Sequence, residues 1–277
     1  MVNHTGQSFS QSSLQSLKNC PRQFQLRYLD KISWPAVSAE PAEKYEENIL
    51  RGNKFHLLCQ QYFAEIPEDE LTAGILDPGL KVLWLNFLKF ISQQNIRRCS
   101  AESMMTMSFR DHRLVAKTDL VAEISPDRYQ IFDWKTSSLI PEKSALSARL
   151  QTILYPYLFT QAGKAFFSDQ TIQPEQVEMI YWYAHHPESP QIFPYSEKLE
   201  KYARETISKL IGLYEKLRST AEIFPLTDNL ETCRYCVYRS LCDRGGRAGS
   251  VELIKYWEEE EGLDLNLEID QIAEIEF

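Results

Sequence analysis

The sequence lacks the features that mark a membrane or secreted protein. It contains no apolar run of about 18 residues, the length that a membrane-spanning helix needs. The opening, Met1 to Gln11, is polar and does not show the basic-then-apolar order of a signal peptide. Internal repeats and low-complexity linkers are missing as well. We therefore expect a cytoplasmic protein with one domain over residues 1–250.

An excess of basic residues is also missing, since the net charge is −9. Ten acids and a single base, Lys255, lie within residues 251–277, so this segment accounts for the whole imbalance. The remaining 250 residues hold 29 bases and 29 acids. A neutral body can still carry a local basic groove, so nucleic-acid binding is not excluded. The acidic tail is typical of a solvated terminal segment, and a regulatory role is the alternative.

Six cysteines in a chain of this size, expected inside the cell, argue against a disulfide framework and for buried thiols or metal ligands. Three follow the spacing C-x2-C-x5-C at Cys233, Cys236 and Cys242, which indicates a metal or cluster site with one position left open. Of the other three, Cys59 and Cys99 fall in segments expected to be regular helix. Cys20 stands in a Cys-Pro turn and is the best fourth ligand. Tetrahedral zinc is the competing occupant.

Helical patterns are predicted over residues 8–27, 43–63, 80–91, 142–162 and 197–218. Ser12 and Gln15 are spaced as a capping box for the first, which Cys20-Pro21 interrupts. Gly52 and His56 lie one turn apart, and the glycine suggests close approach by another backbone or a ligand. Gln151 and Tyr155 have the same spacing and should point to one side of their helix.

Between residues 103 and 135 the hydrophobic period changes to two, and a further strand is predicted at 176–184. Asp119 lies in mid-strand among apolar residues, where a buried carboxylate must be paired or bind metal. The turn at Ser125 to Arg128 predicts a hairpin that brings Asp119 near Asp133. The pattern predicts an α/β domain with a mixed central sheet over about residues 100–185, flanked by helices.

The stretch Tyr129 to Lys135 places an acid and a base two residues apart in a run of strand formers. Side chains at i and i+2 of a strand share a face, so Asp133 and Lys135 should point into one pocket. Phe132 and Trp134 should then anchor the opposite face in a core. Such a pair can hold a hard cation and place a lysine beside a water molecule.

Taken together, six motifs resemble the PD-(D/E)XK nuclease superfamily over about residues 8–245. They are Cys20-Pro21, Gly52-x3-His56, Asp119, Asp133-x-Lys135, Gln151-x3-Tyr155 and the triple-cysteine segment. The pattern is most similar to the iron–sulfur branch, which includes RecB-like exonucleases, the AddB nuclease domain and the CRISPR-associated spacer-processing nuclease. Ala116 departs from this family, which often has glycine three residues before the first catalytic aspartate.

The resemblance implies a restriction-endonuclease-like core and a metal-dependent DNA exonuclease acting in recombination, repair or CRISPR adaptation. By the same resemblance, Mg²⁺ or Mn²⁺ is held by His56, Asp119, Asp133 and the backbone carbonyl of Trp134. Lys135 is the catalytic lysine, and Gln151 and Tyr155 position the strand or the lysine. A [4Fe–4S] cluster held by Cys20, Cys233, Cys236 and Cys242 would join the N-terminal helical part to the C-terminal cysteine segment.

The expected partner is DNA with single-stranded ends, with a helicase or a CRISPR integrase as further partners. Two alternatives remain open at this point. The first is a cluster-stabilised DNA-binding or processing subunit with little activity of its own. The second is a zinc-containing binding or regulatory module without catalysis. If the protein binds DNA, we expect the acidic tail to lie over or near the DNA groove and to weaken binding at low salt.

Overall fold

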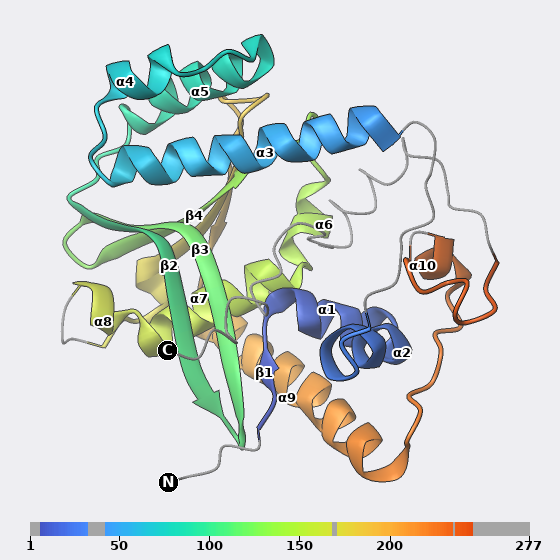
Figure 1. Ribbon diagram of the computed structural model, residues 1–277. Coiled ribbons are helices and arrows are strands. Elements are labelled where there is room, and N and C mark those ends of the chain that lie inside the picture. Colours follow the sequence, from blue (N-terminus) through green and yellow to red (C-terminus); the bar gives the residue numbers. More distant parts are fainter. Residues whose placement is uncertain (1–5, 33–41, 168–170, 235, 246–277) are drawn as a thin grey trace, which may run out of the picture.

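A six-stranded mixed sheet forms the centre of the computed structural model, which describes residues 6–32, 42–167, 171–234 and 236–245 (Figure 1). The strands are β1 (Ser8–Phe9), β2 (Arg98–Phe109), β3 (His112–Ser125), β4 (Arg128–Lys135), β5 (Val177–Tyr183) and β6 (Gln191–Pro194). β3 pairs antiparallel with β2 on one edge, and β4 continues the sheet to β5 and β6. The predicted α/β class with a mixed sheet is confirmed, whereas β1 and β6 were not predicted.

Helices cover both faces of this sheet, with α3, α4 and α5 on one side and α1, α7 and α9 on the other (Figure 1). The longer helices are α1 (Gln11–Asn19), α3 (Ala42–Phe63), α5 (Pro78–Ile91), α7 (Leu150–Ala162) and α9 (Glu197–Thr220). The shorter ones are α2 (Pro21–Phe24), α4 (Glu68–Ala73), α6 (Lys143–Ser147), α8 (Lys164–Phe167) and α10 (Leu230–Arg234). A π-helical turn follows α2 at Gln25–Leu29, and a 3-10 turn precedes β5 at Pro174–Gln176.

Two helix expectations need correction. The cap of α1 is Ser10, which has extended backbone and exchanges hydrogen bonds with Ser13, so the predicted Ser12 lies inside the helix. The helix expected over 142–162 is divided into α6 and α7, because the backbone of Arg149 is extended between them. No glycine or proline marks this break in the sequence.

The α5-side core lies between the sheet and helices α3, α4 and α5 and is rich in stacked aromatic rings. Its buried members include Phe55, Leu83, Phe87, Phe132, Trp134 and Trp182. The ring of Trp134 meets those of Phe87 and Phe132 at 5.4 and 5.2 Å between centroids. Phe132 and Trp134 therefore anchor one face of β4, as predicted, and leave Asp133 and Lys135 on the other.

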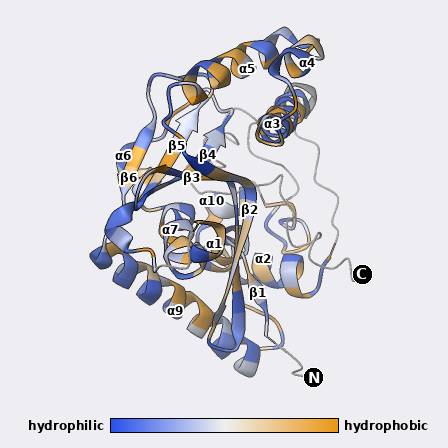
Figure 2. Cartoon of the chain, turned by 90° about the vertical axis from the view of Figure 1, so that its left-hand side faces the viewer, coloured by the Kyte–Doolittle hydropathy of each residue, from blue (hydrophilic) through white to orange (hydrophobic). Residues whose placement is uncertain are grey.

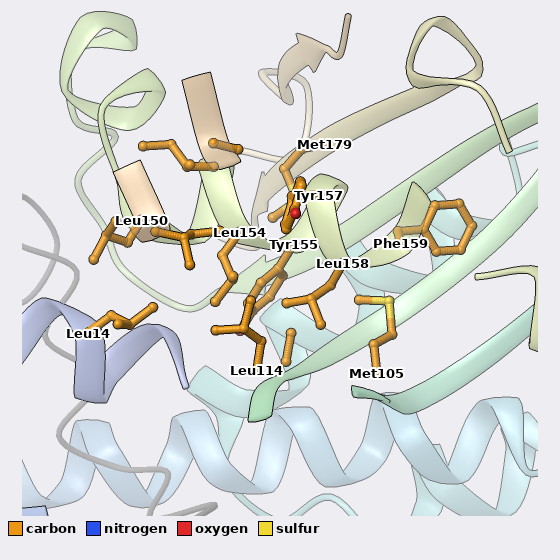
Figure 3. Close-up of a cluster of buried hydrophobic side chains, with 14 of the residues drawn as sticks. Leu14, Met105, Leu114, Leu150, Leu154, Tyr155, Tyr157, Leu158, Phe159 and Met179 are labelled. Carbon is orange, nitrogen blue, oxygen red and sulfur yellow. The ribbon is translucent and has the colours of Figure 1, made fainter. Parts of the chain in front are cut away.

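The α7-side core fills the opposite side of the sheet, beneath α1, α7 and α9. Its buried members include Leu14, Leu114, Leu154, Tyr155, Leu158 and Met179, which converge in Figure 3. Helix α9 contributes Ala203, Ile207, Ile211 and Tyr214 from one face. Figure 2 shows hydrophobic and hydrophilic residues alternating along this helix, as expected where only one face is buried.

β3 contributes to both cores, which the uninterrupted period-two pattern did not predict. Leu114 and Ala116 pack in the α7-side core, but Leu120 and Ala122, of the same parity, pack in the α5-side core. Glu102, on the paired strand β2, has a positive φ of 50° near this change of face. Ala116, which replaces the family's glycine, is buried among apolar neighbours, so its methyl group is accommodated by packing.

None of the described helices combines the length and the apolar character that a membrane span requires.

Candidate active site

The central feature of the site is the point at which β3 and β4 part. The two strands pair from Ser125 and Arg128 down to Leu120 and Phe132. Asp119 and Asp133 occupy the next facing positions, just beyond the last pair. In an antiparallel ladder, facing residues project to the same side of the sheet. The register therefore presents both carboxylates to one space at the opening between the strands.

Asp119 is held by two donors from different elements. Its Oδ2 accepts the backbone N–H of Trp134 at 2.6 Å, and its Oδ1 lies 3.2 Å from His56 Nδ1. Burial would by itself raise the pKa of the Asp119 carboxyl, but the charge and hydrogen bond of His56 and the N–H of Trp134 hold this pKa below its usual value. Asp119 is therefore ionised and partly buried, with 14% of its side chain exposed.

Asp133 is buried and joins Lys135 to helix α7. Its Oδ1 accepts a hydrogen bond from Gln151 Nε2 at 2.5 Å, and its Oδ2 lies 2.8 Å from Lys135 Nζ. Among the described residues, no donor makes a well-directed hydrogen bond to Oδ2. Burial, assisted by the Asp119 charge, raises the pKa of the Asp133 carboxyl despite the nearby Lys135. Burial thus disfavours the ionised form of Asp133, and a bound cation would stabilise it.

Lys135 lies beside both Asp133 and the ring of Tyr181 on β5. Its Nζ is 5.8 Å from the centroid of that ring, and 29% of its side chain is exposed. Burial would lower the pKa of the lysine, but the adjacent Asp133 carboxylate raises it above the usual value. Lys135 therefore carries its proton at neutral pH and can act as a donor.

His56 reaches the site from α3, on the α5-side of the sheet. Phe55 is fully buried in the aromatic core and fixes this part of the helix. A Cβ atom at Gly52 would lie 3.0 Å from Thr136 Oγ1, so the glycine permits close approach of α3 to the segment after β4. The neighbouring group is a side-chain hydroxyl, whereas another backbone or a ligand was expected. Burial would lower the pKa of His56, but the charge of Asp119 raises it above the usual value.

The backbone carbonyl of Trp134 was also expected at the site. The Trp134 N–H points to Asp119, and the Lys135 carbonyl accepts from Ala184 N on the opposite edge. Because the N–H and C=O of one strand residue point to the same neighbouring strand, the Trp134 carbonyl faces the opening beside Asp119. It lies beyond the last β3–β4 pair, so the ladder with β3 does not use it.

Glu102 was not predicted and lies close to the same centre. Candidate ligand atoms of His56, Glu102 and Asp119 are all within 4.8 Å of one another. In the β2–β3 register Glu102 falls opposite Asp119, and its carboxylate forms an ion pair with Lys117. In the sequence, Glu102 immediately precedes the segment with a hydrophobic period of two, so it could be placed near a strand. Only the pairing register of β2 and β3 shows that it lies opposite Asp119.

Gln151 and Tyr155 come from the same face of α7 but have different surroundings. Gln151 donates to Asp133. Tyr155 is 7% exposed and lies in the α7-side core, close to Leu154 and Leu158 (Figure 3). The structure thus brings Gln151 to the carboxylates and places Tyr155 in the packing beneath them.

The four cysteines expected to act together come from the two ends of the described chain. Cys20 ends α1 with extended backbone, Cys233 lies in α10, and Cys236 and Cys242 follow α10. Burial raises the pKa of each of the last three thiols, and the charge of Cys20 contributes in every case. All four are therefore within electrostatic range. Cys59 is buried in α3, and Cys99 is exposed on strand β2 rather than on the expected helix.

Polar contacts join the N-terminal helices to the segment after α9. Gln25 Nε2 donates to the carbonyl of Glu222 at 2.7 Å, and Gln25 Oε1 accepts from Phe224 N at 2.8 Å. The Tyr238 hydroxyl donates to the carbonyl of Ile32 at 2.9 Å. Figure 1 shows α10 beside α2. The two segments that carry the cysteines are thus adjacent through protein contacts alone.

One known protein family matches most of the chain. A family model described as the PD-(D/E)XK nuclease superfamily matches residues 8–243. No curated protein matches the chain. A solved structure described as "Crystal structure of SSO0001" is similar at 13% identity with a TM-score of 0.39, and the match covers 85% of each chain. Because the family model spans all six strands and every residue of the candidate site, the chain belongs to the PD-(D/E)XK nuclease superfamily.

Proposed function

We propose that this protein is a metal-dependent DNA exonuclease. Membership of the PD-(D/E)XK superfamily indicates nuclease activity, which is hydrolysis of phosphodiester bonds. The observation that carries the proposal is the placement of Asp119 and Asp133 at facing positions where β3 and β4 part, with Lys135 paired to Asp133. Two carboxylates can hold a divalent ion that activates a water molecule, and an ammonium group can offset the negative charge that develops on the phosphate.

The ligands that we propose for Mg²⁺ or Mn²⁺ are His56, Asp119, Asp133 and the carbonyl of Trp134. The donor set suits a divalent ion, because it combines an imidazole with oxygen donors, among them the carboxylates of Asp119 and Asp133. The imidazole favours Mn²⁺ over Mg²⁺. Glu102 is a further candidate on the His56 side. A divalent ion held there would lower the pKa of a water molecule and neutralise charge on the scissile phosphate.

Lys135 donates from its protonated Nζ to the phosphate or to the attacking water. This role offsets negative charge as it develops in the transition state, which a preorganised donor does most effectively. A lysine whose pKa is raised by Asp133 is unsuited to remove a proton from water. Gln151 holds the Asp133 carboxylate in place, and Tyr155 positions α7 from below through the α7-side core.

For the cysteines we propose a [4Fe–4S] cluster held by Cys20, Cys233, Cys236 and Cys242. Mutual electrostatic influence among these thiols supports a shared ligand. Three of them follow the spacing C-x2-C-x5-C, which also suits a tetrahedral zinc ion. The cluster would staple the two ends of one domain spanning residues 1–250.

The pathway and the partners follow from the resemblance to the iron–sulfur branch. We propose that DNA with single-stranded ends is the substrate and that the protein acts in the cytoplasm in recombination, repair or CRISPR adaptation. A helicase or a CRISPR integrase is the expected protein partner. The complete carboxylate, carboxylate and lysine set favours an active nuclease over a DNA-binding subunit with little activity of its own.

A single assay tests the exonuclease. Anaerobically purified full-length protein is incubated with end-labelled linear DNA and with circular single-stranded DNA, in Mn²⁺, Mg²⁺ or EDTA. We expect stepwise shortening of the linear substrate with either metal, none in EDTA, and no cleavage of the circle. Cleavage of the circle would replace the exonuclease by an endonuclease. Absence of any metal-dependent cleavage would refute the nuclease.

A further inference from the structure

Arg149 is a buried cation that the proposed chemistry does not use. Only 5% of its surface is exposed, and its backbone is the extended residue between α6 and α7. Among the described residues, its Nε and Nη2 have no hydrogen-bond partner. A buried guanidinium is ordinarily paired, because removing it from water without partners costs several kcal/mol. Two of the three guanidinium nitrogens thus lack a hydrogen-bond partner among the described residues, and a bound anion would supply one.

The guanidinium lies beside the catalytic lysine. Its Cζ is 5.9 Å from the centroid of the Tyr181 ring, and Lys135 Nζ is 5.8 Å from the same centroid. The Tyr181 hydroxyl shares a hydrogen bond with Thr152 Oγ1 at 2.7 Å. This bond fixes the ring that both cations approach. Both cations therefore lie within 6 Å of one ring centroid and belong to one region of the site.

The start of helix α7 adds a second feature that favours an anion. The helix begins at Leu150, directly after Arg149, and has 13 residues. No side chain caps its N-terminus, and no acidic residue lies in its first turn. The free N–H groups and the positive end of the helix dipole attract negative charge. Gln151 in this first turn already reaches Asp133.

We propose that Arg149 and the N-terminus of α7 form a second phosphate site, which binds the phosphate next to the scissile one on the same DNA strand. The inference rests on the proposed nuclease function and extends it to substrate positioning. A planar guanidinium matches phosphate oxygens in a two-pronged hydrogen-bonded pair. Arg149 then sets the register of the strand, so that Lys135 and the carboxylates meet the scissile phosphate.

Binding is measured in EDTA, where cleavage cannot interfere, using a fluorescent single-stranded oligonucleotide and the full-length protein. Arg149→Met should weaken binding roughly 10-fold and lower the slope of log affinity against log salt by about 0.7. Arg110→Met is the matched control, because Arg110 is exposed at the β2–β3 turn and paired with Glu215. The control should bind within twofold of the wild type. Equal affinity and slope for Arg149→Met and wild type would overturn the site.

A second measurement locates the phosphate. Oligonucleotides carrying one neutral methylphosphonate linkage are scanned along the strand. The wild type should lose affinity at one linkage next to the cleavage position, and Arg149→Met should no longer show that loss. If both proteins lose affinity at the same linkages by the same factor, Arg149 binds no phosphate.

Stability separates a binding role from a structural one. The thermal midpoint of Arg149→Met should equal or exceed that of the wild type, because an unpaired buried charge is removed. Should this variant fail to fold, Arg149→Gln, which keeps a polar side chain but removes the charge, is scanned in its place. Disappearance of the loss at that linkage then supports the site, and an unchanged loss overturns it.

Failure of the second phosphate site is distinguishable from failure of the nuclease. A wild type that loses affinity at one linkage, in a way that disappears in Arg149→Met, but never cleaves refutes only the nuclease. A wild type that cleaves, with Arg149→Met cleaving and binding equally well, refutes only the second phosphate site.

Discussion

The carboxylate centre and the cysteine junction are organised in different ways. At the carboxylate centre, Asp119 and Asp133 are fixed by partners from β4, α3 and α7, above a layer of interlocked aromatic rings. At the cysteine junction, a few hydrogen bonds such as those of Gln25 and Tyr238 join the chain ends, and the thiols repel one another when ionised. The protein thus preorganises the first region by itself, whereas the second depends on what the thiols bind.

The largest expected effect comes from removing the catalytic lysine or its carboxylate partner. Lys135→Ala or Asp133→Asn should reduce the cleavage rate by at least roughly 100- to 1,000-fold, because charge in the transition state is no longer balanced. DNA binding in EDTA and the circular dichroism spectrum should persist. Lys89→Ala, at an exposed lysine, is the control. Cleavage near the wild-type rate in Lys135→Ala would contradict the proposed centre.

The next effect acts on folding rather than on chemistry. Cys236→Ser should yield mostly insoluble protein without the visible absorbance of an iron–sulfur cluster, because the junction loses a ligand. Cys99→Ser, at an exposed cysteine on β2, should keep its colour and its solubility. Iron and sulfide analysis of both variants provides the measurement. A soluble, colourless wild type that contains zinc would replace the cluster by a zinc site.

A smaller effect tests the support of Asp133. Gln151→Leu removes the donor to Asp133 Oδ1 and should lower metal affinity or activity roughly 10- to 100-fold. Tyr155→Phe keeps the ring in the α7-side core and should remain much closer to the wild type. Titration of activity with Mn²⁺ measures both variants. If the tyrosine variant loses more than the glutamine variant, the hydroxyl of Tyr155 has a role beyond packing.

The smallest expected effect concerns the acidic tail, residues 251–277, which lie outside the described residues. Deleting the tail should raise DNA affinity a few-fold at low salt, because ten acids no longer compete with the phosphates. The gain should disappear near 1 M salt, where charges are screened beyond about 3 Å. Fluorescence anisotropy over a range of salt concentrations measures the difference. Unchanged affinity at low salt would show that the tail does not reach the DNA groove.

Local patterns in the sequence predicted much of this centre, because its key features are local. The spacing of Asp133 and Lys135 fixes a common face, and the turn at Ser125–Arg128 fixes the hairpin that brings Asp119 opposite Asp133. The positive φ of Asp127, 58°, belongs to that turn. The main helices, α3, α5 and α9, followed their hydrophobic periods for the same reason.

The missed features depend on residues far apart in the chain. Glu102 acquires its meaning only from the β2–β3 register, and β1 forms only by pairing with β3 about a hundred residues later. The break before α7 has no local signal, because Arg149 is extended at a point where its side chain packs against Tyr181 on another element. Contacts between elements far apart in the chain, rather than local propensity, decide such positions.

The change of face in β3 has a mechanical consequence for the whole domain. One part of β3 is packed in the α7-side core and the next part in the α5-side core. Asp119 lies in the short segment where the strand passes from one core to the other. Looser packing in either core would shift the Asp119 carboxylate relative to Asp133. Destabilising substitutions in distant parts of either core should therefore impair cleavage before the fold is lost.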